Sequence, residues 1–338
     1  MNYIGSKFKL SSFIKDTICS IVGQNLSDKI FCDLFAGTGI IGRIFKKDVK
    51  KVISNDIEYY SYVLNKNYIE NHRYFDVSNL LDMLNNLPLI EDGFIYKNYC
   101  LGSGSNRQYF TDENGQKIDA IRRQIEVWFK NKIINGNVYY SLLVSLIESA
   151  DKVANTASVY GAFLKNIKKT AAKKIFLEPA LFEINDNSHE VYNEDSNKLI
   201  KQISGDILYL DPPYNERQYG ANYHLLNTVA KYDNFIPKGK TGLRKYFRSN
   251  YCTKNNVLKS FQDIIEDAKF KYIFLSYNNE GLMSLDDIKS VMKRYGKYNV
   301  VKCKYQRFKS DKTENRNHKA FFTYEYLHIL DKKYNHFQ

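Results

Sequence analysis

Short apolar runs alternate with helical spacings of apolar residues in the first part of the chain. The run Lys29–Phe35 predicts a strand, and it is followed at once by Gly37 and Gly39, which predict a tight turn. A helical pattern comes next, the run Lys51–Asp56 predicts a second strand, and another helical pattern follows. Strand, glycine turn, helix, strand and helix in this order are typical of the opening of a doubly wound parallel sheet.

The pattern changes in the middle of the chain. From residue 75 to residue 181 there are few strand signals, and helices are predicted at Gln116–Lys132 and Val138–Val153. We interpret this stretch as an inserted and mostly helical region. It divides one α/β domain into the two segments 1–74 and 182–338.

Strands and helices alternate again after the insert. The predicted strands are Glu190–Asn193, Asp206–Asp211 and Lys271–Asn278, and the predicted helices begin after Ser196 or cover Asn222–Lys231 and Ser284–Arg294. The last two extended runs, Asn299–Phe308 and Thr323–Leu330, are spaced so that they can pair as an antiparallel edge. The predicted fold class is therefore α/β with a doubly wound, mixed sheet.

Composition excludes several classes of protein. With 338 residues, 43% hydrophobic residues and 26% charged residues, the chain has the composition of a globular protein with a sizeable core. No apolar run is long enough to cross a bilayer, and Lys7, Lys9, Lys15 and Asp16 interrupt the region where a secretory signal would lie, so we expect a cytoplasmic protein. The five cysteines and six histidines form no motif with metal-ligand spacing, and no metal is predicted.

The basic charge suggests a polyanionic partner. The formal net charge is +13, and it is concentrated in Lys165–Lys174, Lys238–Gln262 and Lys293–Lys319. Such clusters on one face would form a track for the phosphates of a nucleic acid. Codon bias of an AT-rich genome and ordinary solvated surfaces remain the alternatives.

Two segments near the first strands carry candidate chemistry. Asp33–Gly39 places small residues where a strand turns into a helix, so that backbone amides can approach a ligand closely. Asp56, at the end of the second strand, has a carboxylate that suits a ribose diol. A glycine turn with a purely structural role, and an acid that caps the following helix, are the alternatives.

The segment Asp211–Tyr214 reads DPPY and follows an apolar strand. Two prolines hold the backbone extended, so the carbonyl of Pro212 can accept a hydrogen bond beside the carboxylate of Asp211. Tyr214 adds a flat aromatic face. Two acceptors beside an aromatic ring suit the exocyclic amino group of a stacked base.

Glycine turn, Asp56 and DPPY in this order resemble the S-adenosylmethionine-dependent DNA adenine N6-methyltransferases of the alpha class. The resemblance includes YIGSK at 3–7, which is similar to the cofactor segment of the family, and NEDS at 193–196. It also includes Arg217–Asp233, which is similar to the helix of members associated with restriction-modification systems. Together the matches cover 1–71 and 189–330.

The resemblance implies the methyltransferase fold, S-adenosylmethionine as cofactor, and a role for each matched residue. The residues around the cofactor would be Tyr3, Lys7, Asp33, Phe35, Gly37, Gly39, Asp56, Asp195 and Asp211. The base site would be formed by Asp211, Pro212, Pro213 and Tyr214. The residues that would contact DNA directly beyond this site are Asn215, Arg217 and Gln218, although Arg217 and Gln218 could equally brace their loop. Outside the matched segments, the basic charge at 165–174 suggests phosphate contacts from Lys165, Lys168 and Lys169, with ordinary surface as the alternative. Residues 75–181 would be part of target recognition.

The implied reaction is transfer of a methyl group to N6 of a flipped-out adenine in double-stranded DNA. The protein would be the modification component of a restriction-modification system, associated with the nucleoid of a prokaryote and paired with a cognate endonuclease. The alternatives are methylation of adenine in RNA or of cytosine N4 in DNA, and a non-catalytic DNA-binding subunit of the same fold. Asp211 favours adenine, because cytosine N4 enzymes more often have a serine at this position.

Overall fold

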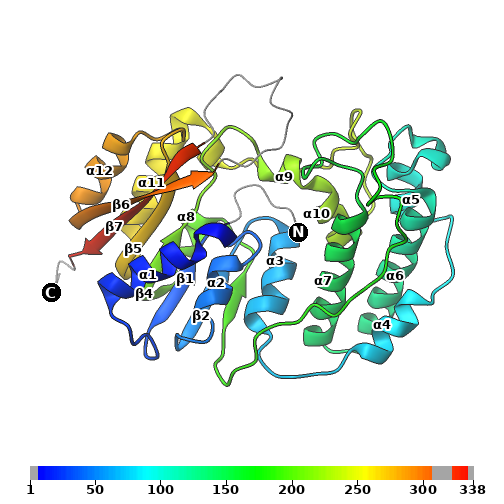
Figure 1. Ribbon diagram of the computed structural model, residues 1–338, viewed down its shortest axis with the longest axis horizontal. Helices are drawn as coiled ribbons and strands as arrows, with labels where there is room; N and C mark the ends of the chain where they lie inside the picture. The colour runs from blue at the N-terminus through cyan, green and yellow to red at the C-terminus, as the bar shows by residue number, and fades with distance from the viewer. Residues whose placement is uncertain (1–6, 307–321, 334–338) are drawn as a thin grey trace. The chain divides into compact units, whose positions relative to one another are not determined.

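The computed structural model describes residues 7–306 and 322–333, and it divides them into two compact units (Figure 1). The helical unit comprises Glu58–Ile184 and Tyr219–Phe247. The sheet unit comprises the described residues of Gly5–Ile57, Asn185–Gln218 and Arg248–Gln338. The helical unit is larger than the insert predicted at 75–181, because chain segments on both sides of that insert pack into the same core.

The sheet unit is built on one mixed sheet. Within the described residues its strands are β1 (Ile30–Asp33), β2 (Lys51–Asn55), β3 (Glu190–Tyr192), β4 (Ser204–Leu210), β5 (Lys269–Asn278), β6 (Gly296–Gln306) and β7 (Phe322–Lys332). Their order is β3-β2-β1-β4-β5-β7-β6. The first five strands of this order are parallel, and β7 runs antiparallel to both β5 and β6. The predicted doubly wound, mixed α/β sheet and its antiparallel edge are confirmed.

Helices cover both faces of this sheet, and its central strands are accordingly buried in continuous runs rather than at alternate residues. One face carries α1 (Ser11–Val22) and α2 (Ile40–Phe45), and the rings of Phe31 in β1 and Phe45 in α2 stack at 4.3 Å. The other face carries α8 (Ser196–Leu199), α11 (Lys254–Asp267) and α12 (Leu285–Lys293). The unit also contains two short 3-10 helices, η1 (Phe8–Leu10) and η4 (Asn250–Cys252). Cys32 of β1 belongs to a cluster with Leu199 and Phe261 on this second face.

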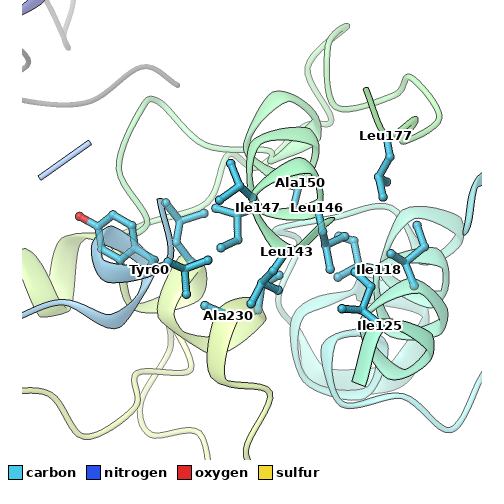
Figure 2. Close-up of a cluster of buried hydrophobic side chains, with 14 of the residues drawn as sticks. Tyr60, Ile118, Ile125, Leu143, Leu146, Ile147, Ala150, Leu177 and Ala230 are labelled. Carbon is cyan, nitrogen blue, oxygen red and sulfur yellow. The ribbon is translucent and has the colours of Figure 1, made fainter. Parts of the chain in front are cut away.

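The helical unit has a core of its own. Its helices are α3 (Tyr59–Asn65), α4 (Ser78–Asn85), α5 (Phe94–Tyr99), α6 (Asp112–Lys130), α7 (Gly136–Val153), α9 (Tyr219–Asn222) and α10 (His224–Lys231), with π-helical turns η2 (Lys66–Glu70) and η3 (Leu101–Ser105). Figure 2 shows Ile118 and Ile125 of α6 facing Leu143 and Leu146 of α7, and all four are fully buried. The two predicted helices of the insert correspond to α6 and α7.

The strand order sets the place where a ligand is expected. From β1 the chain proceeds outward to β2 and β3, and it then returns to place β4 on the other side of β1. In doubly wound sheets the ligand binds outside the carboxyl ends of the strands at such a reversal. Here these ends are Asp33 of β1 and Leu210 of β4. None of the described helices is long and apolar enough to span a membrane.

Candidate active site

The glycine turn that follows β1 is held by an acid from the neighbouring strand. Gly37 has φ 53° and Gly39 has φ 75°, values in the left-handed region that favours glycine. The amide of Gly37 donates to Oδ2 of Asp56 at 2.8 Å, and the amide of Gly39 donates to the carbonyl of Ala36 at 2.8 Å. The predicted turn and the predicted acid are therefore in direct contact at the carboxyl ends of β1 and β2.

A buried amide that sequence reasoning missed ties three strand ends together. Asn55 Nδ2 donates to the carbonyls of Leu34, at 3.2 Å, and Glu194, at 3.1 Å. Its Oδ1 accepts from the amide of Glu194 at 3.0 Å. The side chain of Asn193 donates to the carbonyl of Asp56 at 2.7 Å. An asparagine at the end of an apolar strand was the only sequence signal for this role.

Asp195 and Phe35 lie beside a second residue that sequence reasoning missed. Oδ1 of Asp195 caps α8 by accepting from the amides of Asn197, at 3.0 Å, and Lys198, at 3.2 Å. The ring of Phe35 meets Tyr251 edge to face at 5.0 Å. The hydroxyl of Tyr251 donates to Oδ1 of Asn197 at 2.9 Å, so Phe35 packs against a ring that is fixed in place.

Asp33 is a buried carboxyl at the end of β1. Its side chain is only 1% exposed, and among the described residues no donor lies within hydrogen-bond distance of its Oδ1. Burial raises the pKa of Asp33 to about 8, the charge of Asp211 adds to this shift, and the backbone amides of Gly42 and Phe35 oppose it. Asp33 is therefore mostly protonated at neutral pH.

The ammonium of Lys7 lies between two carboxylates. Its Nζ is 2.8 Å from Oδ1 of Asp211, directly after β4, and 3.3 Å from Oε1 of Glu325 in β7. The hydroxyl of Ser276 in β5 donates to the same oxygen of Glu325 at 2.8 Å. Sequence reasoning placed Lys7 and Asp211 in the site but did not pair them, and it missed Glu325, whose position depends on the register of β7 against β5.

Burial and charge set the protonation of this group. Burial raises the pKa of Asp211 to about 6, against the opposing effect of the Lys7 ammonium. For Lys7 burial alone would lower the pKa, but Asp211 and Glu325 outweigh it and raise this pKa well above its usual value. The lysine is therefore charged, and Asp211 is mostly ionised above pH 6.

The rest of the DPPY segment presents an aromatic ring beside this carboxylate. Pro212 is buried, and the carbonyl of Tyr214 accepts from the amide of Leu282 at 3.0 Å. The ring of Tyr214 meets Tyr277 edge to face at 6.1 Å, and Nζ of Lys7 lies 5.4 Å from its centroid. Asp211, Lys7 and Tyr214 thus form one polar and aromatic surface at the end of β4.

The residues predicted to contact DNA differ in how available their side chains are. Gln218 Nε2 donates to the carbonyl of Ser249 at 3.4 Å, and its Oε1 accepts from the amide of Ser249 at 2.9 Å, so this side chain braces its loop. Oδ1 of Asn215 accepts from the amide of Arg217 at 3.0 Å, and Arg217 itself is exposed.

The three lysines predicted for DNA contacts lie in the helical unit. Lys165 and Lys169 are exposed, whereas Nζ of Lys168 donates to the carbonyl of Thr156 at 2.7 Å. Tyr3 lies outside the described residues, as do five of the ten basic residues of the third basic cluster. Within the described part of the chain, no group of three His, Cys, Asp or Glu side chains is arranged to hold a metal ion.

Comparison with known proteins matches the chain to one family. The model for the D12 class of N6 adenine-specific DNA methyltransferases matches residues 3–291. The chain is 64% identical to the Type II methyltransferase M.NlaIII of Neisseria lactamica, over 99% of this chain and 100% of that protein. It is 40% identical to the Type II methyltransferase M.FokI of Planomicrobium okeanokoites, over 98% of this chain but only 53% of that protein.

A viral protein and one solved structure complete the comparison. The chain is 37% identical to the Type II methyltransferase M.CviAII of Paramecium bursaria Chlorella virus 1, over 92% of this chain and 93% of that protein. A solved protein of Pyrococcus horikoshii, assigned as an RNA methyltransferase, aligns with 97% of this chain and 83% of its own. Its TM-score of 0.32 and identity of 9% are too low to support an inference.

Proposed function

Because this chain belongs to the D12 class of N6 adenine-specific DNA methyltransferases, we propose that it methylates N6 of a flipped-out adenine in double-stranded DNA, with S-adenosylmethionine as methyl donor. Membership of the family confirms the predicted enzyme class. The observation that carries the finer proposal is the partly buried Asp211 carboxylate, paired with the buried Lys7 at 2.8 Å, at the reversal of the strand order.

The residues at the ends of β1 and β2 fit the proposed cofactor. The adenosyl group has a ribose diol that donates hydrogen bonds, and the methionine part carries positive charge. Asp56 offers a carboxylate for the diol, and Asp33 offers an oxygen that meets no donor among the described residues. The turn at Gly37 and Gly39 allows close approach of the backbone, and Phe35, Asp195 and Lys7 border the same region in the proposal. When bound, S-adenosylmethionine supplies an electrophilic methyl group.

Asp211 and Pro212 would act on the amino nitrogen of adenine. The lone pair of this nitrogen is delocalised into the ring, so it is a weak nucleophile. If the Asp211 carboxylate and the Pro212 carbonyl accept its two hydrogens, they favour a geometry in which the lone pair is localised. They also stabilise the positive charge that develops on nitrogen. Lys7 is a positioning residue in this proposal, because its ammonium holds Asp211 at one oxygen.

Tyr214 would hold the flipped base outside the DNA double helix. Flipping a base costs a few kcal/mol, and an aromatic ring offsets part of this cost by stacking. The carbonyl of Tyr214 accepts a hydrogen bond from the amide of Leu282, and this bond fixes the backbone that carries the ring.

The restriction-modification context is also part of the proposal. Three relatives are named Type II methyltransferases, and M.NlaIII matches over the whole of its length. We therefore assign this chain the modification role, with a cognate endonuclease as functional partner and the DNA-containing cytoplasm of a prokaryote as its location. In this proposal the helical region at 75–181 contributes to target recognition.

The test is transfer of labelled methyl from S-adenosylmethionine to unmethylated genomic DNA, with RNA of similar composition as a parallel substrate. Digestion to nucleosides is expected to yield N6-methyladenine from DNA alone. N4-methylcytosine, or label in RNA, would contradict the proposal. Absence of cofactor binding in calorimetry would instead favour the non-catalytic alternative.

Two variants test the base site. Asp211→Asn is expected to lower turnover by at least a hundredfold, since loss of one electrostatic contact to a transition state costs roughly that much. Tyr214→Ala is expected to lose most turnover while it retains cofactor binding. Asp16→Asn, on α1, and Tyr74→Ala, which both replace exposed residues, are the matched controls. Turnover of either test variant at the level of its control would remove that residue from the base site.

A further inference from the structure

A short hairpin follows α10 in the helical unit. The amide of Lys238 donates to the carbonyl of Leu243 at 2.9 Å, and the amide of Leu243 donates back to the carbonyl of Lys238 at 2.7 Å. Gly239 and Gly242, with φ 66° and 70°, allow the chain to reverse between these residues. We call residues 236–245 the basic hairpin.

Side chains from another loop of the same unit hold the tip of the basic hairpin. The guanidinium of Arg107 donates to the carbonyl of Gly239 at 3.1 Å and to the carbonyl of Asn98 at 3.0 Å. The buried hydroxyl of Tyr99 donates to the carbonyl of Gly242 at 2.7 Å. A Cβ at Gly242 would lie only 2.7 Å from the Tyr99 ring, so the backbone of Gly242 packs closely against this ring. The tip is therefore fixed to the helical unit.

The base of the basic hairpin is fixed as well. Arg244 is 8% exposed, and its Nη2 lies 2.8 Å from Oδ2 of Asp233. Its guanidinium stacks over the ring of Phe235 at 4.9 Å. The charge of Arg244 is thus neutralised by Asp233.

The other basic side chains of the hairpin point to solvent. Lys238, Lys240 and Lys245 are exposed, and among the described residues no carboxylate lies within ion-pair distance of them. The sequence from Lys238 to Gln262 contains no acid. The cluster at 165–174 differs, because Lys168 donates to Thr156 and Lys174 pairs with Glu113 at 2.8 Å. A rigid element that carries three unneutralised lysines suits a polyanion.

We propose that the basic hairpin binds the phosphate backbone of duplex DNA through Lys238, Lys240 and Lys245, and that Arg107 and Tyr99 are its positioning residues. This inference rests on the proposed function, since it takes the same DNA as ligand. Phosphate contacts fix the orientation of a protein on DNA without reading its sequence. The hairpin therefore contributes affinity and registration and leaves the choice of bases to other residues.

The test compares two triple variants of the full chain. Lys238→Gln/Lys240→Gln/Lys245→Gln removes the proposed contacts. The control, Lys50→Gln/Lys201→Gln/Lys269→Gln, removes the same charge near the amino ends of β2, β4 and β5. The candidate site lies at the opposite, carboxyl ends of the strands. Binding of a random-sequence 30-base-pair duplex is measured by fluorescence anisotropy over a range of salt concentrations. Cofactor binding by calorimetry and methyl transfer are measured alongside.

The hairpin variant is expected to bind DNA at least tenfold more weakly than the control at low salt. Its plot of log affinity against log salt is expected to be shallower by about 2 to 3, because each lost phosphate contact contributes about 0.9 to that slope. Cofactor binding should not change. Tyr99→Phe, which keeps the ring but loses the hydrogen bond to Gly242, should weaken binding in the same direction and by less.

Equal slopes for the two triple variants would overturn the inference. If the unaltered chain methylates DNA and the hairpin variant binds as tightly as the control, only this inference fails. If the unaltered chain neither binds nor methylates duplex DNA, the proposed function fails with it.

Discussion

Lys7 is the residue on which the charge of the site depends. Its ammonium is 5% exposed and is the shared partner of Asp211 and Glu325. Removal of this cation would leave the Asp211 carboxylate beside Glu325 without an opposing charge, and the pKa of Asp211 would then rise. The lysine therefore favours the ionised form of Asp211.

The pKa of Asp211 predicts a pH dependence of methylation. Since this pKa is about 6 and the ionised form is the proposed acceptor, kcat/KM is expected to fall about tenfold per pH unit below pH 6. In Lys7→Met the pKa of Asp211 rises, because the opposing ammonium is gone, and the acid limb moves to higher pH. Methylation rates from pH 5 to pH 9 measure the acid limb of the unaltered enzyme and that of Lys7→Met.

Lys15→Met is the control for this experiment, since Lys15 of α1 forms a half-exposed pair with Asp48, which follows α2. Its acid limb should coincide with that of the unaltered enzyme. An acid limb that stays near pH 6 in Lys7→Met would show that Lys7 does not control the ionisation of Asp211.

Individual site residues could be predicted only where a local motif carried them. Gly37, Asp56 and Asp211 lie at strand ends that the apolar pattern already marked, and the structure brings the first two into contact. Glu325 and Tyr251 carry no such motif. Their places depend on pairing and packing between segments far apart in the sequence, which periodicity does not specify.

At the scale of elements, one lysine closes the end of a helix. Lys332 of β7 is buried, and its ammonium donates to three carbonyls at the carboxyl end of α11, those of Ile265 at 2.7 Å, Glu266 at 3.0 Å and Ala268 at 2.6 Å. These carbonyls have no partner within the helix, and a cation is favoured at this end of the helix dipole. The contact joins α11 to the antiparallel edge of the sheet.

We expect Lys332→Met to destabilise the protein by about 2 to 3 kcal/mol, because it leaves buried carbonyls without a charged donor. Urea denaturation followed by circular dichroism measures the change. The adjacent Lys333 is exposed, so Lys333→Met should change stability little. Equal midpoints for the two variants would mean that solvent satisfies these carbonyls as well as Lys332 does.

The elements that sequence predicted are those with a strong period. β1, β2, β4 and β5 lie within two residues of their predicted starts, since each is an apolar run bounded by polar residues. The helix α11 was missed, although Val257, Phe261, Ile264 and Ile265 have helical spacing and are buried. Its amino-terminal part lies in a basic stretch, which was interpreted for charge rather than for periodicity.

At the scale of the whole molecule, the two units are interleaved in sequence. The helical unit takes its last helix, α10, from the segment that follows DPPY, and Leu225, Leu226 and Val229 of this helix are fully buried in its core. Oδ1 of Asn227 accepts from the amide of Tyr60 at 3.0 Å. Residues 58–184 alone would therefore lack the part of their hydrophobic core that α10 supplies.

This arrangement predicts the behaviour of fragments. Residues 58–184 alone are expected to unfold without a cooperative transition, whereas the same residues joined to 219–247 by a flexible glycine-serine linker should melt cooperatively. Thermal denaturation by circular dichroism distinguishes the two fragments. A linked fragment in which Leu225 and Leu226 are replaced by Ser is the control and should resemble the short fragment. Cooperative melting of residues 58–184 alone would contradict the prediction.

The pairing of β2 with β3 has a consequence for the newborn chain on the ribosome. Asn55 lies opposite Tyr192, and the whole of 58–184 is translated between these two strands. At about 5 to 20 residues per second, that interval lasts roughly 7 to 30 s. Throughout it β2 has an open edge, and such an edge can pair with a neighbouring nascent chain. Chaperone protection of the emerging polypeptide thus matters most before β3 has been synthesised.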